Sequence, residues 1–125
     1  MSERQYLPKA LLAEQPSLAM VTEEFLESIG FDALHAPTAA NALAVVAAGG
    51  ISLAVIGGSL PDMSGADLAA KTRVISPDLP IVLASGSDTE ALAERFFGDG
   101  ALSLLPKPYT ERELRAAIAA AGGAI

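Results

Sequence analysis

Short apolar runs alternate with segments of helical spacing along nearly the whole chain, and this alternation restricts the fold more than any other feature. The runs are four to six residues long and mostly apolar, as in strands that are buried on both faces of a sheet. Parallel neighbours need helical crossovers between them, and those crossovers are right-handed. The sequence therefore predicts a doubly wound α/β domain with five helices, whose five parallel strands lie at 9–13, 31–36, 53–56, 80–84 and 101–105.

The first helix has clear signals at both of its ends. Pro16 and Ser17 suit its first turn, and Gly30 suits the position directly after its last turn. Four apolar residues recur between these ends at three- and four-residue spacing, so they share one side of the helix. We expect this side to face the core: Leu18, Val21, Phe25 and Ile29.

The other four helices begin at residues that commonly cap helices or after a long loop. The last helix has the strongest signal, because Thr110 and Glu113 form a capping box at its start. Its expected core residues are Leu114, Ala117, Ile118 and Ala121. The remaining helices are expected to begin after Thr38, to span 66–75 after the loop 57–65, and to begin after Ser87 or Asp88.

Charge and composition exclude several classes of function. Eight basic residues are scattered among fifteen acidic ones, giving a net charge of −7, so we expect no nucleic-acid partner. The chain has no cysteine and a single histidine, His35, which argues against a zinc site. Its apolar stretches are far shorter than the roughly 20 residues that span a bilayer, and no secretory signal is visible. We therefore expect a cytoplasmic protein with no membrane contact.

The length of 125 residues suits one domain with a single core. We expect this domain to cover residues 9–121. The segments 1–8 and 122–125 then form short tails, or mark places where the domain continues into a longer protein.

Three short segments carry a more specific signal than the alternating pattern. They are Leu60–Gly65 (LPDMSG), Asp78–Gly86 (DLPIVLASG) and Lys107–Tyr109 (KPY), the last of them followed by the capped final helix. With these segments the chain resembles a response-regulator receiver domain of two-component signalling, from about Lys9 to Ala121. The resemblance implies a flavodoxin-like fold with the strand order 2-1-3-4-5.

The resemblance also implies where the phosphorylation site of the family would lie. In receiver domains an aspartate at the end of the third strand accepts the phosphoryl group, and an acidic pair after the first strand holds Mg²⁺. The acceptor position corresponds to Gly57, which has no side chain, and no Asp or Glu occurs between Asp32 and Asp62. The acidic pair corresponds to Ala13 and Glu14, so we expect no metal site and only a weak remnant at Glu14.

Two residues that assist phosphorylation in the family are retained. Ser85 corresponds to the hydroxyl that bonds the phosphoryl oxygen, and Lys107 corresponds to the lysine that offsets its charge. We expect Lys107 to pair with Glu14, and an anion bound by Lys107 and Ser85 is the alternative. The aromatic residue that reports phosphorylation in the family corresponds to Leu104, three positions before the lysine.

These departures lead us to expect a pseudo-receiver, that is, a receiver domain that works without phosphorylation. Such a domain is a protein-interaction or regulatory module, not an enzyme, and it needs no cofactor. The expected partner is a signalling protein, either a histidine kinase or an adjacent domain of the same chain. Asp62 lies five residues beyond Gly57, and we expect it to be a solvated turn residue and not a substitute acceptor.

The fourth helix, fifth strand and fifth helix form the usual dimer or output surface of the family, and a homodimer through this surface is a further expectation. Candidate contact residues are Arg95, Phe97, Arg112 and Tyr109. Neighbouring helical residues point about 100° apart, so Phe97 either is an exposed contact or packs under the following loop. The alternative function is a ligand sensor, in which these arginines and aromatic rings hold a cyclic dinucleotide such as cyclic di-GMP.

Overall fold

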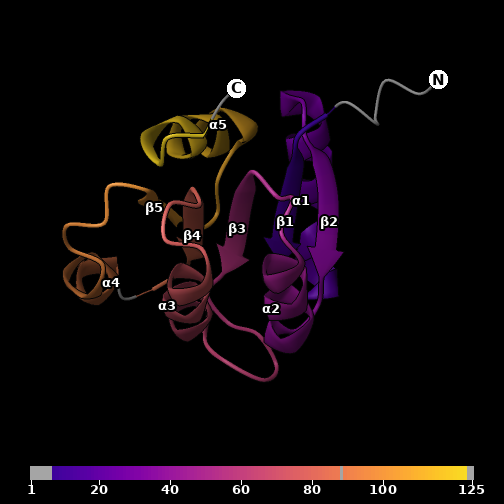
Figure 1. The fold of residues 1–125 in the computed structure, drawn as a ribbon. Helices are drawn as coiled ribbons and strands as arrows, with labels where there is room; N and C mark the ends of the chain where they lie inside the picture. Colours follow the sequence, from indigo (N-terminus) through magenta and orange to yellow (C-terminus); the bar gives the residue numbers. More distant parts are fainter. Residues whose placement is uncertain (1–6, 88, 124–125) are drawn as a thin grey trace.

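A five-stranded parallel sheet forms the centre of the molecule (Figure 1). The structure is a computed structural model that describes residues 7–87 and 89–123. The strand order β2-β1-β3-β4-β5 confirms the predicted fold class and the order that the family resemblance implied. The strands are β1 (Lys9–Ala13), β2 (Asp32–Ala36), β3 (Leu53–Gly57), β4 (Ile81–Ser85) and β5 (Leu102–Pro106).

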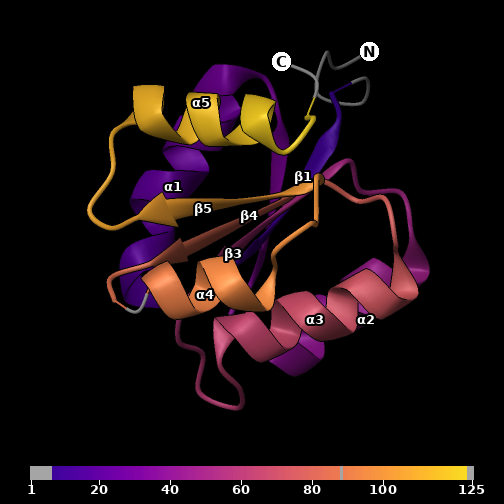
Figure 2. The same cartoon turned by 90° about the vertical axis from the view of Figure 1, so that its left-hand side faces the viewer.

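Five helices cover both faces of this sheet, as Figure 2 shows. α1 and α5 pack on one face, and α2, α3 and α4 pack on the other. One hydrophobic cluster lies under each of these two groups of helices. This arrangement is that of a doubly wound domain. The helices are α1 (Pro16–Ile29), α2 (Ala39–Ala48), α3 (Gly65–Ile75), α4 (Thr89–Arg95) and α5 (Glu111–Ala120).

The two clusters follow directly from the apolar strands. Successive side chains of a strand point to opposite faces, so a continuous apolar run supplies both cores at once. Leu11 and Ile56 lie in the cluster under α2 and α3, whereas their neighbours Leu12 and Val55 lie in the cluster under α1 and α5. The pattern of the strands therefore explains why both faces are covered.

The helix caps agree with the sequence where the structure describes them. The hydroxyl of Thr38 accepts a hydrogen bond from the amide of Asn41, 3.1 Å away. Thr110 and Glu113 form both bonds of the predicted capping box, and the four expected core residues of α5 are buried. Asp88, one of the two caps considered for α4, lies outside the described residues.

The prediction for the buried side of α1 was wrong for two of its four residues. Ala19, Thr22 and Leu26 face the core, whereas Leu18 and Val21 are 49% and 56% exposed. Small side chains at positions 19 and 22 let the helix backbone approach the sheet closely, which turns the larger Leu18 and Val21 outward. Phe25 and Ile29 pack at the margin of the core.

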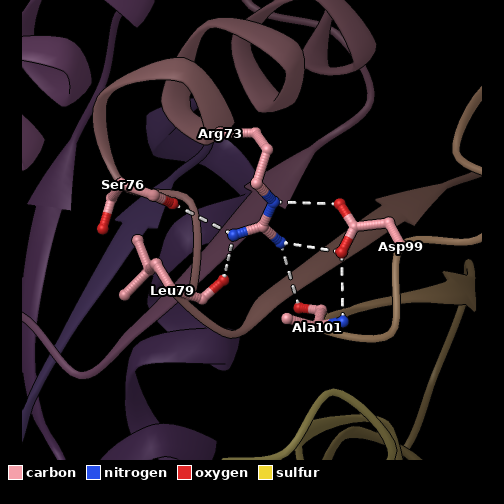
Figure 3. Close-up of polar contacts among 5 residues, drawn as sticks. All are labelled: Arg73, Ser76, Leu79, Asp99 and Ala101. Atoms are coloured by element: carbon pink, nitrogen blue, oxygen red, sulfur yellow. Dashed lines mark hydrogen bonds and ion pairs between the residues drawn. The ribbon is translucent and has the colours of Figure 1, made fainter.

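An arginine cross-link joins three segments beside the amino ends of β4 and β5 (Figure 3). The guanidinium of Arg73 binds the carboxylate of Asp99 through Nε (2.9 Å) and Nη2 (3.2 Å). It also donates to three carbonyl oxygens, those of Ser76, Leu79 and Ala101. Arg73 therefore ties the end of α3 to the loops that lead into β4 and β5.

Chain segments next to the predicted domain boundaries make ordered contacts. The carbonyl of Pro8 accepts a hydrogen bond from the amide of Asp32, and the amide of Gly123 donates to the carbonyl of Ile118. The rest of the two predicted tails, residues 1–6 and 124–125, lies outside the described residues. Within 7–87 and 89–123, no helix combines the length and apolar character that crossing a membrane requires.

Candidate functional site

Two hollows meet at the carboxyl ends of the strands, where ligands bind in doubly wound folds. We call them the crevice and the groove. The crevice, about 190 Å³, is lined by Glu14, Gln15, Leu18, Gly58, Ser59, Ser85, Gly86, Ser87 and Lys107. The groove, about 360 Å³, runs between α1 and the β5–α5 loop and is lined by Glu14, Ser17, Leu18, Val21, Thr22, Phe25, Lys107, Pro108 and Tyr109. Glu14 and Lys107 line both hollows.

Glu14 and Lys107 form an ion pair, as the sequence predicted. Nζ of Lys107 lies 2.8 Å from Oε2 of Glu14, which is only 3% exposed. The other carboxylate oxygen, Oε1, accepts a hydrogen bond from the amide of Gln15 at 3.0 Å. Both oxygens of the buried carboxylate therefore have a donor, as a buried charge requires.

The backbone of Glu14 is held by the neighbouring strand β2. Its amide donates to the carbonyl of Ala36 at 3.3 Å. Its carbonyl oxygen lies 2.8 Å from Nε2 of His35, and since a carbonyl only accepts, Nε2 must carry the proton. The position of Glu14 is thus fixed through both its side chain and its main chain.

Gly57 ends β3 directly beneath the Glu14 carboxylate. A Cβ atom built on Gly57 would lie 2.5 Å from Oε1 and 2.6 Å from Cδ of Glu14, and it would also contact Oε2. Such separations are far shorter than a van der Waals contact. Any side chain at position 57 therefore needs the space that the Glu14 carboxylate occupies.

The other predicted site residues lie around this pair. Ser85 ends β4 and lines the crevice, but its hydroxyl donates to the carbonyl of Ser87 at 2.8 Å. The carbonyl of Ser85 accepts a hydrogen bond from the amide of Lys107. Ala13 is fully buried at the end of β1, and Leu104 packs partly buried against the core under α2 and α3. The structure thus brings Glu14, Gly57, Ser85 and Lys107 to one edge of the sheet.

Tyr109 closes one side of the groove. Its hydroxyl lies 2.6 Å from Oγ1 of Thr22, and its ring meets that of Phe25 at a centroid distance of 6.4 Å. Burial raises the pKa of the Tyr109 phenol, and the nearby Glu14 carboxylate adds to this, against the lowering effect of the Thr22 hydrogen bond. The contact with Thr22 was not predicted, because no local pattern links these two residues, which lie 87 positions apart.

The four residues proposed as an interaction face do not form one cluster. Arg95 is paired with Asp67 of α3 at 2.8 Å and lies over the ring of Phe96. Phe97 is 91% exposed, which decides between the two alternatives in favour of an exposed ring. Arg112 is exposed on α5, whereas Tyr109 packs against α1 and belongs to the groove.

Asp62 has a structural role that the sequence analysis missed. Its two carboxylate oxygens accept hydrogen bonds from the amides of Ala39 (2.8 Å) and Ala40 (3.0 Å), in the first turn of α2. These bonds lower the pKa of the Asp62 carboxyl. A carboxylate at a helix amino terminus stabilises that helix. Because Asp62 caps a helix that precedes it in the chain, no local pattern signals the contact.

A metal site needs several ligands in one place. Among residues 7–87 and 89–123, no three histidine, aspartate or glutamate side chains gather closely enough to hold an ion. The features that the structure does bring together are the Glu14–Lys107 ion pair, the glycine beneath it and the adjoining groove.

Known proteins resemble this chain over most of its length. DNA-binding transcriptional regulator NtrC of Rhizobium meliloti (strain 1021) is 30% identical over 101 residues, which are 81% of this chain and 21% of NtrC. Sensor kinase CckA of Brucella abortus (strain 2308) is 26% identical over 106 residues, which are 83% of this chain and 11% of CckA. The chain thus spans a small part of these relatives.

A solved structure shares the fold over nearly its full length. It is a response regulator receiver protein from Sinorhizobium medicae WSM419, with 25% identity and a TM-score of 0.80 over 92% of this chain and 94% of that one. Residues 11–119 match the response regulator receiver domain as a family. By this match and its strand order, this chain belongs to the response regulator receiver domain family.

Proposed function

We propose that this receiver domain of two-component signalling works without phosphorylation, as an interaction and regulatory module. The observation that carries the proposal is Gly57 at the carboxyl end of β3, the position that corresponds to the phosphoacceptor of the family. Phosphoryl transfer to a receiver needs a carboxylate nucleophile there, and glycine offers no nucleophile. No Asp or Glu occurs between Asp32 and Asp62, so no neighbouring residue can replace the acceptor.

The surroundings of Gly57 support the same proposal. Ala13 stands where the family has one of its two metal-binding acids, so half of the Mg²⁺ site is missing. The charge of Lys107, which would offset a phosphoryl group, is already used by Glu14. Asp62 is bonded to two amides of α2 and is therefore a poor substitute nucleophile.

We propose the groove as the docking surface of the module. Leu18 and Val21 expose about half of their surface on α1, beside the ring of Tyr109. An amphipathic helix can place its apolar side chains in a groove of this kind. Glu24 is exposed on the same helix, so a partner helix with basic flanks fits best. A histidine kinase or an adjacent domain supplies the helix, in keeping with the sensor kinase and the transcriptional regulator among the relatives.

Acetyl phosphate with Mg²⁺, followed by intact mass measurement, tests the absence of phosphorylation. We expect no phosphoryl group on this chain under conditions that modify an active receiver domain in parallel. One phosphoryl group per chain would refute the proposal.

For the groove, Val21→Glu should abolish binding of a partner helix, whereas Met20→Glu, on the same helix but outside the groove lining, should leave binding unchanged.

The cyclic dinucleotide alternative has less support. It needs free arginines and aromatic rings in one place. Arg95 is bonded to Asp67, and Tyr109 is bonded to Thr22 on another side of the domain, so two of the four candidate residues are already engaged. Calorimetric titration with cyclic di-GMP should therefore give no binding heat.

Self-association through α4, β5 and α5 is a further part of the proposal, carried by the exposed ring of Phe97. Aromatic rings of this kind are common anchors of protein interfaces. We therefore expect Phe97→Ser to shift the sedimentation equilibrium of the chain towards the monomer. We also propose that the module is one domain over residues 9–121. In this proposal it has no enzymatic activity, needs no cofactor and works in the cytoplasm.

A further inference from the structure

We infer that the Glu14 carboxylate takes the structural place of the missing acceptor side chain, and thereby holds Lys107 and the β5–α5 loop in one permanent position. This inference rests on the proposed function, since it presupposes a receiver domain without an acceptor. It then explains how the crevice of such a domain keeps its shape. The space above Gly57 is filled by Glu14 itself, since a Cβ at position 57 would lie 2.5 Å from Oε1.

The carboxylate of Glu14 is held firmly at this point. Oε2 binds Nζ of Lys107, Oε1 binds the amide of Gln15, and strand β2 fixes the main chain of Glu14. The Glu14 side chain is 3% exposed, so its carboxylate depends on these donors and not on bulk water. The contact with Gly57 is therefore a lasting feature of the packing.

The backbone at Gly57 cannot move away from Glu14 either. On its other side the carbonyl of Gly57 lies against Gly65, where an added Cβ would collide with that oxygen. The amide of Gly65 also donates to the carbonyl of Gly58 at 3.0 Å. A side chain at position 57 can then be accommodated only if Glu14 leaves its place.

The position of Lys107 matters beyond the crevice. Pro108 and Tyr109 follow it directly and form one wall of the groove. The Glu14–Lys107 pair and the Thr22–Tyr109 hydrogen bond therefore tie this wall to β1 and α1 at two points. With both ties permanent, the groove keeps one shape regardless of any phosphoryl donor.

A double-mutant cycle tests whether Glu14 fills the space at position 57. We expect Gly57→Ala to lower the urea midpoint when Glu14 is present, and to lower it much less in the Glu14→Ala background. Gly57→Ala with Glu14→Gln is the matched control, because glutamine keeps the size of the side chain and should keep the full effect. Equal effects of Gly57→Ala in all three backgrounds would overturn the inference. If Gly57→Ala alone fails to fold, folding of the double variant Gly57→Ala with Glu14→Ala supports the inference. A double variant that also fails to fold contradicts the inference.

A rescue experiment tests whether the carboxylate positions Lys107. In Glu14→Ala the amide resonances of Lys107 and Tyr109 should shift, and adding Gly57→Asp should return them towards their original positions. Glu14→Ala with Gly57→Asn, which has the same shape without the charge, should not. Equal spectra of these two double variants would contradict the inference. Phosphorylation of the unaltered chain would refute the proposed function but leave both of these results unchanged.

Discussion

The carboxylate of Glu14 lies 2.8 Å from Nζ of Lys107 and joins the end of β1 to the end of β5 across 93 residues of sequence. Glu14 is buried, whereas a quarter of the Lys107 side chain is exposed. Removing one partner of such a pair leaves an uncompensated charge, which is more harmful than removing both. This asymmetry makes the pair testable.

Lys107→Met should lower the free energy of unfolding by about 2 kcal/mol, because the Glu14 carboxylate loses its counter-charge inside the protein. Lys107→Met combined with Glu14→Gln should recover a large part of this loss. Urea unfolding at neutral pH measures both variants. If Lys107→Met were as stable as the original chain, the ion pair would contribute nothing to the free energy of unfolding.

Tyr109 should make stability depend on alkaline pH. Burial raises the pKa of its phenol above the ordinary value of 10.0, so the folded chain keeps this proton to higher pH than the unfolded chain does. The contribution of Tyr109 is then constant below about pH 10 and is lost as pH rises through the folded pKa. Urea unfolding between pH 9 and 11 should show a steeper decline for the original chain than for Tyr109→Phe. Parallel curves would contradict the raised pKa.

Thr72→Val should stabilise the domain. Oγ1 of Thr72 is fully buried in α3 and has no hydrogen-bond partner among the described residues. Valine has nearly the same shape without the unpaired hydroxyl, so we expect a gain of about 1 kcal/mol in the free energy of unfolding. Thr72→Ser, which keeps the hydroxyl and removes a methyl group, should instead destabilise. A loss of stability in Thr72→Val would mean that the hydroxyl has a partner.

Arg73→Lys should lower the free energy of unfolding by about 2 kcal/mol, the order of a hydrogen bond to a charged group, although the charge is retained. Lysine cannot bind both oxygens of Asp99 and three carbonyl groups at once, because it lacks the planar fork of arginine. Amide hydrogen exchange should increase at residues 99–101, while exchange in α1 stays the same. Unchanged exchange at both places would rule out the cross-link as a source of stability.

The fold could be predicted from the sequence because its signals are local. Apolar runs such as 53–56 define strands, and the capping box at Thr110 and Glu113 defines the start of a helix. The pair of Glu14 with Lys107 could also be predicted, because parallel strands end at one edge and bring these residues together. Local patterns therefore indicate the strands and the cap, whereas the pair follows from the strand order and site positions that the family resemblance implied.

Other contacts between distant segments could not be predicted, because neither a local pattern nor the family resemblance indicates them. The apolar spacing in α1 indicated Leu18 and Val21 as core residues, but close packing of Ala19 and Thr22 on the sheet decides which side is buried. Nothing in the sequence around Asp62 indicates that it caps α2, 23 residues earlier. The occupation of the space above Gly57 also depends on the side-chain conformation of Glu14, which spacing alone does not determine.

Titration with beryllofluoride and Mg²⁺, followed through amide resonances, is the most direct test of a receiver domain that works without phosphorylation. This reagent occupies the acceptor site of receivers that bind a phosphoryl group on a carboxylate. Here we predict that the resonances of Gly57, Ser85 and Lys107 stay unchanged at reagent concentrations that saturate an active receiver domain. The reason is that no acceptor carboxylate is present and that Lys107 is held by Glu14. Saturable shifts of these three resonances would contradict the account.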